Sequence, residues 1–137
     1  MTTLPETLSA SVSAFAARWF TDLDRHAPAG ELESLLSDAG LEMVFPERTL
    51  HSLADFRDWY EAVCRVYTDE AHTLEQMTVT PAGDDIEVTV VVLWRATQTV
   101  DGSRIAMRAH QRWRLRRTGT EAGFAITEYR VDDLTAI

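Results

Sequence analysis

Residues 87–116 read EVTVVVLWRATQTVDGSRIAMRAHQRWRLR, and this stretch decides the fold. Two runs rich in β-branched and aromatic residues flank the pair Asp101–Gly102, which is typical of a two-residue β-hairpin turn. In such a turn both central residues take positive φ, and Val100 faces Ser103. The stretch therefore predicts a long antiparallel hairpin.

The two faces of the predicted hairpin differ in polarity. In this register Val92 lies opposite Gln111 and Trp94 lies opposite Ala109, and the face they share is apolar apart from Gln111. The other face collects Glu87, Thr89, Arg95, Arg108, His110, Arg112, Arg114 and Arg116. A lone amide on a buried face needs hydrogen-bond partners, so Gln111 is either a structural bridge or part of a ligand pocket.

Composition and charge exclude several classes of protein. The chain has 137 residues, 45% of them hydrophobic, and a formal net charge of −9. This charge argues against nucleic acid as a partner. The single cysteine, Cys64, offers no intramolecular disulfide and no metal-binding spacing, so we expect neither a metal nor another cofactor. With no basic segment at the N-terminus and no apolar run of membrane length, we expect a cytoplasmic protein that does not enter membranes.

The remaining elements follow from periodicity and turn signals. Apolar residues at helical spacing (Val12, Phe15, Ala16, Trp19, Phe20 and Leu23) predict a helix over 9–24. We further expect a short helix over 30–40, a strand over 41–45, a helix that begins after Ser52 as N-cap, and strands over 72–80 and 124–131. Ile126 and Tyr129 can share a face of the last strand only through a bulge.

Helices followed by a run of antiparallel strands indicate the α+β class. We expect residues 1–137 to form a single domain. In it, a cone-like curved antiparallel sheet wraps around an N-terminal helix pair and a third helix, as in cystatin-like folds and α+β barrels.

Several segments together resemble the nuclear transport factor 2-like superfamily, and within it the SnoaL-like branch. They are WFTDLDRHAP (19–28), FRDWYEAV (56–63), AHTLEQMTV (71–79), VVLWRAT (91–97) and HQRWRL (110–115). The resemblance implies a cone with a pocket at its open end and a homodimer formed through the outer sheet face. It also implies cofactor-free acid–base chemistry of the isomerase, dehydratase or cyclase kind.

The chain departs from several enzymes of this superfamily. The apolar stripe of the first helix has no tyrosine and the inner face of the hairpin has no carboxylate, whereas ketosteroid isomerase needs both. The Asp-Arg-Asp set of limonene epoxide hydrolase and the late aspartate of SnoaL-type cyclases are also missing, with Gln111 at the comparable position. Scytalone dehydratase is most similar, because its aspartate at the end of the first helix has a counterpart in Asp24 and a sheet histidine has one in His72.

Imidazole titrates near neutral pH, so His72 is the candidate general base and Asp24 the carboxylate that orients it. The structural alternatives are a hydrogen-bonded histidine at a strand start and an aspartate that caps the turn at His26–Pro28. His26, His51 and His110 are expected at the surface.

We expect the pocket to bind a small hydrophobic or aromatic molecule. Its predicted lining is Trp19, Phe20, Phe45, Trp59, Tyr60, Trp94, Gln111 and Tyr129. The alternative is a non-catalytic dimerisation or accessory domain, whose cone is filled by the four tryptophans.

Overall fold

The computed structural model describes residues 3–137 as three helices and six strands. In chain order these are α1 (Thr3–Asp24), α2 (Ala29–Glu33), β1 (Glu42–Val44), β2 (Thr49–Leu50), α3 (Leu53–Val66), β3 (Tyr67–Ala82), β4 (Asp85–Gln98), β5 (Arg104–Arg117) and β6 (Phe124–Ala136). The predicted order is confirmed, with the short strand β2 as an addition.

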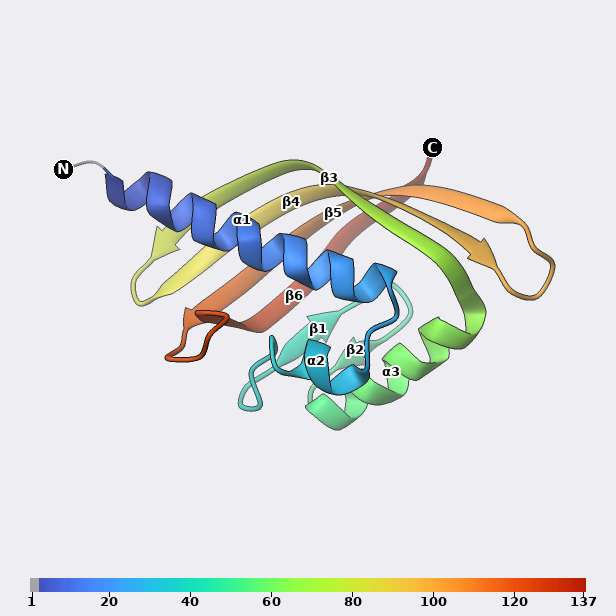
Figure 1. The fold of residues 1–137 in the computed structure, drawn as a ribbon, viewed down its shortest axis with the longest axis horizontal. Coiled ribbons are helices and arrows are strands. Elements are labelled where there is room, and N and C mark those ends of the chain that lie inside the picture. Colours follow the sequence, from blue (N-terminus) through green and yellow to red (C-terminus); the bar gives the residue numbers. More distant parts are fainter. Residues whose placement is uncertain (1–2) are drawn as a thin grey trace.

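One curved sheet with the strand order β2-β1-β6-β5-β4-β3 forms the wall of the fold. Its neighbouring strands are antiparallel except β1 and β6, which run parallel. Figure 1 shows that the sheet bends around the helices and stays open. The α+β class with a curved sheet is confirmed. The sheet is open, and the parallel pairing of β1 with β6 makes it mixed, where a wholly antiparallel sheet was expected.

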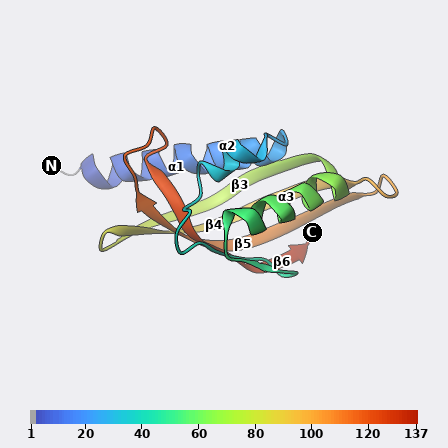
Figure 2. The same cartoon turned by 90° about the horizontal axis from the view of Figure 1, so that it is seen from below.

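Helix α1 lies across the concave side of the sheet (Figures 1 and 2). All six residues of its predicted stripe are buried, from Val12 at 0% exposed to Leu23 at 8%. The helix begins earlier than predicted, at Thr3, and ends at Asp24 as expected. No helix within residues 3–137 is long and apolar enough to cross a membrane.

Helix α2 is shorter than predicted, because the chain leaves it to join the sheet. Leu36 forms a parallel bridge with Ile126, and the backbone N–H of Ser37 donates to the carbonyl of Ile126 at 2.8 Å. Leu35 and Leu36 are buried as a result. Pairing with β6 therefore outweighs the helical pattern after Glu33.

Helix α3 begins where the cap residue predicts. The Ser52 side chain accepts a hydrogen bond from the backbone N–H of Asp55 at 3.0 Å. The carboxylate of Asp55 accepts in return from the backbone N–H of His51 at 3.0 Å. Together the two bonds satisfy donors at the helix N-terminus, in a variant of the capping box in which the carboxylate accepts from the residue before the cap.

The β4–β5 hairpin has the predicted faces but a different register. Val88 lies opposite Trp113, two residues away from the predicted pairing. The loop is longer than two residues, since Gln98 pairs with Ser103, and Gly102 has φ 72° whereas Asp101 is not among the residues with positive φ. A shift of two residues leaves every side chain on its predicted face.

Two bulges position residues that matter for the interior. The pairing of β5 with β6 shifts between Arg114 and Leu115, which allows Ile126 and Tyr129 to be buried together, as predicted. The pairing of β3 with β4 shifts between Thr68 and Ala71. Strand β3 therefore begins at Tyr67, five residues before the predicted start at His72.

Ion pairs cover the convex face of the sheet. Arg108 bonds Glu75 at 2.9 Å, and Arg114 bonds Asp85 at 3.2 Å. The guanidinium of Arg108 lowers the pKa of Glu75 below its usual value. Such exposed pairs contribute little to stability, so the fold depends on the buried concave side.

The cap of α3 provides a test of local stability. Replacing Ser52 with alanine leaves the Asp55 N–H without its side-chain acceptor, so we expect the free energy of unfolding to fall by about 1 kcal/mol and the Tm by roughly 3–5 °C. Urea and thermal unfolding followed by circular dichroism measure both. Ser11→Ala, at an exposed position within α1, is the matched control and should leave the Tm unchanged or slightly raised. Equal Tm values for both variants would contradict the capping role.

Candidate functional site

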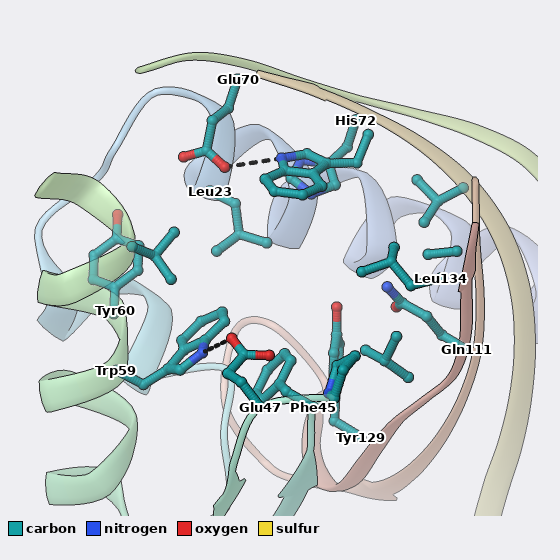
Figure 3. A pocket seen from close by; sticks show the side chains of 16 residues that line it. Leu23, Phe45, Glu47, Trp59, Tyr60, Glu70, His72, Gln111, Tyr129 and Leu134 are labelled. Carbon is teal, nitrogen blue, oxygen red and sulfur yellow. Dashed lines mark hydrogen bonds between the residues drawn. The ribbon is translucent and has the colours of Figure 1, made fainter. Parts of the chain in front are cut away.

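A cavity of about 120 Å³ opens between α3, the β1–β2 turn and the concave face of the sheet (Figure 3). It is lined by Leu23, Phe45, Pro46, Glu47, Trp59, Tyr60, Val63, Glu70, His72, Val92, Trp94, Ala109, Gln111, Tyr129, Val131 and Leu134. An engineered apolar cavity of about 150 Å³ holds benzene, whereas drug-sized ligands occupy about 300 Å³ or more. The volume therefore suits a molecule with a single ring.

The structure brings most of the predicted site residues together around this cavity. Its walls include Phe45, Trp59, Tyr60, His72, Trp94, Gln111 and Tyr129. Trp19, Phe20 and Asp24 do not line it. Trp19 is 1% exposed, and Phe20 stacks on the imidazole of His72 with ring centroids 5.0 Å apart. These two rings therefore lie behind the cavity wall, whereas the sequence placed them in the lining.

Asp24 and His72 form a dyad held at two points. The carboxylate of Asp24 accepts the backbone N–H of His72 at 3.0 Å, and its Oδ1 lies 2.5 Å from Nδ1 of the imidazole. Asp24 is the last residue of α1 and His72 lies on β3, an edge strand, so the contact joins the helix end to the sheet edge. The side chain of His72 is 11% exposed and that of Asp24 26% exposed.

This contact sets the chemistry of the imidazole. A carboxylate only accepts hydrogen bonds, so Nδ1 carries the hydrogen and Nε2 of the neutral ring carries a lone pair. Among residues 3–137 no side chain is hydrogen-bonded to Nε2, and His72 lies in the cavity wall. The neutral ring therefore has an unshared lone pair at Nε2, in a side chain that lines the cavity.

A chain of hydrogen bonds runs along the inner face of β5 and β6. Trp19 Nε1 donates to the hydroxyl of Tyr129 at 3.4 Å, and Trp113 Nε1 donates to Oε1 of Gln111 at 3.0 Å. Burial raises the pKa of Tyr129 to about 12. The hydrogen bonds from Trp19 and Gln111 act in the opposite direction and lower the pKa, but their effect is smaller. Figure 3 shows the Tyr129 hydroxyl and the Gln111 amide directed into the cavity. Gln111 therefore bridges to Trp113 and also lines the cavity.

The wall formed by α3 is largely apolar. The Tyr60 hydroxyl donates to the carbonyl of Ala27 at 2.6 Å, and burial raises the pKa of Tyr60 above its usual value. The hydroxyl proton of Tyr60 is therefore held in a hydrogen bond to the backbone. Trp59 stacks on Phe45, with ring centroids 4.1 Å apart, and its Nε1 donates to Glu47 at 3.2 Å.

Glu70 is a cavity residue that the sequence did not identify. Its side chain is 5% exposed; Oε1 accepts from Trp94 Nε1 at 3.0 Å, and Oε2 lies 2.5 Å from His26 Nε2. Its signal in the sequence was weak, because Thr68–Glu70 reads as the polar end of a helix. His26 is half-buried against Glu70, which corrects its predicted surface position.

The other reactive side chains lie apart from the cavity wall. His51 and His110 are exposed, as predicted. Cys64 is half-buried, and burial raises the pKa of its thiol. Within the part of the chain that the structure describes, no group of three or more His, Cys, Asp or Glu residues is arranged to hold a metal ion.

Comparison with known proteins identifies the fold. No protein-family model and no curated protein matches the sequence. A proposed scytalone dehydratase from Novosphingobium aromaticivorans superposes with a TM-score of 0.84 at 12% identity, over 100% of this chain and 89% of that one. A nuclear transport factor 2-like superfamily protein from Salmonella enterica gives 0.83 at 9% identity, over 96% and 92%.

A third solved structure is the type 3 hexachlorocyclohexane dehydrochlorinase from Novosphingobium barchaimii. It gives a TM-score of 0.78 at 14% identity, over 97% of this chain and 92% of that chain. The resemblance seen in the sequence is thus confirmed at the level of architecture: this chain has the nuclear transport factor 2-like fold.

Proposed function

We propose that the protein binds a small apolar or aromatic molecule in its cavity and acts on it by cofactor-free acid–base chemistry, with elimination as the preferred reaction and isomerisation or cyclisation as related ones. The observation that carries the proposal is the Asp24–His72 dyad, whose imidazole lies in the wall of a largely apolar cavity. An oriented imidazole with a carboxylate behind it is an effective general base.

The reaction begins when Nε2 of His72 removes a proton from a carbon of the bound ring. Asp24 stabilises the imidazolium that forms and does not itself accept the proton. The electrons of the broken C–H bond form a C=C bond, and the bond from the adjacent carbon to a hydroxyl breaks with its electron pair. The hydroxyl takes the proton from His72 and leaves as water, so the enzyme returns to its starting state.

Two polar groups are suited to assist the departing oxygen. The hydroxyl of Tyr129 accepts from Trp19, which leaves its own proton free for a ligand, and the Gln111 amide adds a further donor. Because a donor aimed at developing negative charge stabilises a transition state, these groups favour the loss of a hydroxyl.

Two of the structural neighbours support elimination by their names, since a dehydratase removes water and a dehydrochlorinase removes hydrogen chloride. At 12% and 14% identity they indicate the architecture alone, so the choice of elimination depends on the dyad of this chain.

The rival function is a non-catalytic accessory domain with a filled core. Trp19 and Trp113 are buried in the core, as this rival requires. Trp59 and Trp94 instead line a cavity of about 120 Å³, which is several times the space that one water needs. This difference favours a ligand-binding cavity over a filled cone.

We also propose a cytoplasmic homodimer formed through the convex sheet face. A hollow there is lined by both signs of charge, including Glu87, Arg112, Arg114 and Glu128. A two-fold interface brings the same patch of each subunit together, so a patch of mixed charge can be self-complementary.

Removing the base tests the proposed reaction. We expect His72→Ala to lower turnover by about 10²–10⁴-fold, and Asp24→Asn to lower it strongly because the tautomer is no longer fixed. The assay incubates the protein with a panel of hydroxylated and chlorinated six-membered rings and detects alkenes by gas chromatography and mass spectrometry. His110→Ala, on the convex face, is the control and should match the wild type. A product that His72→Ala forms at the wild-type rate would refute the assignment.

Tyr129 provides a test of protonation state. Its pKa is raised to about 12, above the value of about 10 in an unfolded chain. This contribution to stability is therefore complete below pH 10 and is lost as the pH rises from 10 to 12. We expect Tyr129→Phe to lose less free energy of unfolding than the wild type between pH 9 and 11.5, as measured by urea titration. Tyr60 remains in both proteins, so part of the alkaline decline persists. An identical decline in both proteins would contradict a raised pKa at Tyr129.

The dimer is tested by light scattering coupled to gel filtration. We expect a mass of twice 15.4 kDa for the wild type. The double variant Arg112→Glu, Arg114→Glu should shift toward the monomer, because it places like charges across the two-fold axis. A monomeric wild type at high micromolar concentration would exclude the proposed interface.

A further inference from the structure

Glu70 places a buried carboxylate in the wall of an otherwise mostly apolar cavity. Figure 3 shows it at the edge of the cavity, with its carboxylate directed toward the space between the labelled side chains. Its side chain is 5% exposed and lies among the cavity-lining residues. The mechanism proposed above gives this group no role.

The hydrogen bonds of Glu70 leave it with acceptor capacity. Each oxygen meets one donor, Oε1 from Trp94 at 3.0 Å and Oε2 from His26 at 2.5 Å. A carboxylate has about four lone-pair sites, so roughly one on each oxygen remains for a ligand. A buried carboxylate is costly unless it is hydrogen-bonded, and His26 supplies one such bond from outside the cavity lining.

The backbone on both sides of this pair takes unusual conformations. His26 and Asp69, the residue before Glu70, both have φ 51°, and within residues 3–137 they are the non-glycine residues with positive φ. Asp69 lies in the bulge between Thr68 and Ala71 at the start of β3. Bulges are common next to functional sites, and this one directly precedes Glu70, which shares the inner face of β3 with His72.

We propose that Glu70, held by Trp94 and His26, is the anchor for a hydrogen-bond-donating group of the ligand. The ligand class is then a single ring that carries a hydroxyl or an amine, neutral or cationic. Anionic rings are rejected, because the Glu70 carboxylate in the cavity wall repels their negative charge. This inference rests on the proposed function for the existence of a bound ring, and it adds the polar group that the ring must carry.

Glu47 is a natural control for this role. Like Glu70 it lines the cavity and accepts from a tryptophan, in this case Trp59 at 3.2 Å. Figure 3 draws both hydrogen bonds at different edges of the same cavity. Glu47 is exposed, so water competes for its oxygens, whereas Glu70 is shielded. Anchoring should therefore depend on Glu70 and not on Glu47.

The structural alternative is that the Glu70–His26 pair only clips the end of α1 to β3. Such a clip would affect stability and would leave ligand selectivity unchanged. The decisive quantity is therefore the ratio of affinities for two rings of similar size, one with a donor and one without.

The experiment measures binding of phenol, aniline, fluorobenzene and benzoate to the full chain by NMR of the tryptophan indole N–H groups, with Trp94 assigned from Trp94→Phe. We expect phenol to bind about tenfold more tightly than fluorobenzene and to shift the Trp94 resonance, since a hydrogen bond to a charged group has about this effect. Aniline should also bind, and benzoate should bind at least tenfold more weakly than phenol.

Variants then assign the effect to Glu70. Glu70→Gln should reduce the phenol-to-fluorobenzene ratio to about twofold or less, while Glu47→Gln leaves it unchanged. His26→Gln keeps Glu70 in place and should retain preference for phenol, even where the Tm falls, which separates anchoring from clipping. If Glu70→Gln does not fold, His26→Gln decides. A preference of His26→Gln for phenol over fluorobenzene, together with the shift of the Trp94 resonance, supports the anchor. Loss of that preference overturns the anchor.

The outcomes distinguish this inference from the proposed function. Equal affinity for phenol and fluorobenzene, or an unchanged ratio in Glu70→Gln, overturns the anchor and leaves the His72 chemistry standing. Absence of binding by all four probes at millimolar concentration overturns both the anchor and the single-ring cavity. Selective binding by a wild type whose His72→Ala variant keeps full turnover supports the anchor and removes the dyad mechanism.

Discussion

Two hydrogen bonds between the Asp24 carboxylate and His72 link helix α1 to the sheet. One oxygen accepts the backbone N–H of the edge strand, and the other accepts the side chain of the same residue. The apolar stripe of α1 positions the helix over the sheet, but apolar contacts are not directional. A two-point hydrogen bond to one residue fixes how far the helix extends over β3. The cavity lies at this end of the helix, between Leu23 and the aromatic side chains of α3.

The interior of the cone divides into a packed half and an open half. Trp19, Phe20 and Trp113 fill the packed half, and Trp59 and Trp94 border the open half. Each indole N–H has an acceptor: Tyr129, Gln111, Glu47 or Glu70. Because these acceptors also hold the rings in place, polar groups of the cavity and the aromatic core are parts of the same network.

Much of this arrangement followed from local rules in the sequence. The faces of the hairpin, the Ser52 cap and the bulge between Ile126 and Tyr129 all depend on neighbours within a few residues. The pairing of Asp24 with His72 was expected from a resemblance, and its geometry came from the structure. Glu70 could not be found in this way, because β3 begins five residues before its predicted start and because the partner of Glu70, His26, is 44 residues away. The length of α2 was missed for a similar reason, since pairing with Ile126 is a long-range contact.

The register of the β4–β5 hairpin has a consequence for how this fold can vary. The loop between Gln98 and Ser103 is two residues longer than the tightest turn, and the inner face is unchanged by that difference. Insertions or deletions of two residues therefore keep the same side chains on the inner face. They shift the facing residues of β4 and β5 by one position on that face. A change of one residue would instead exchange Gln111 and Trp113 with the arginines of the convex face. Evolution of new cavity shapes at this hairpin is thus expected to proceed in steps of two residues, with one-residue changes confined to the loop or absorbed by a bulge.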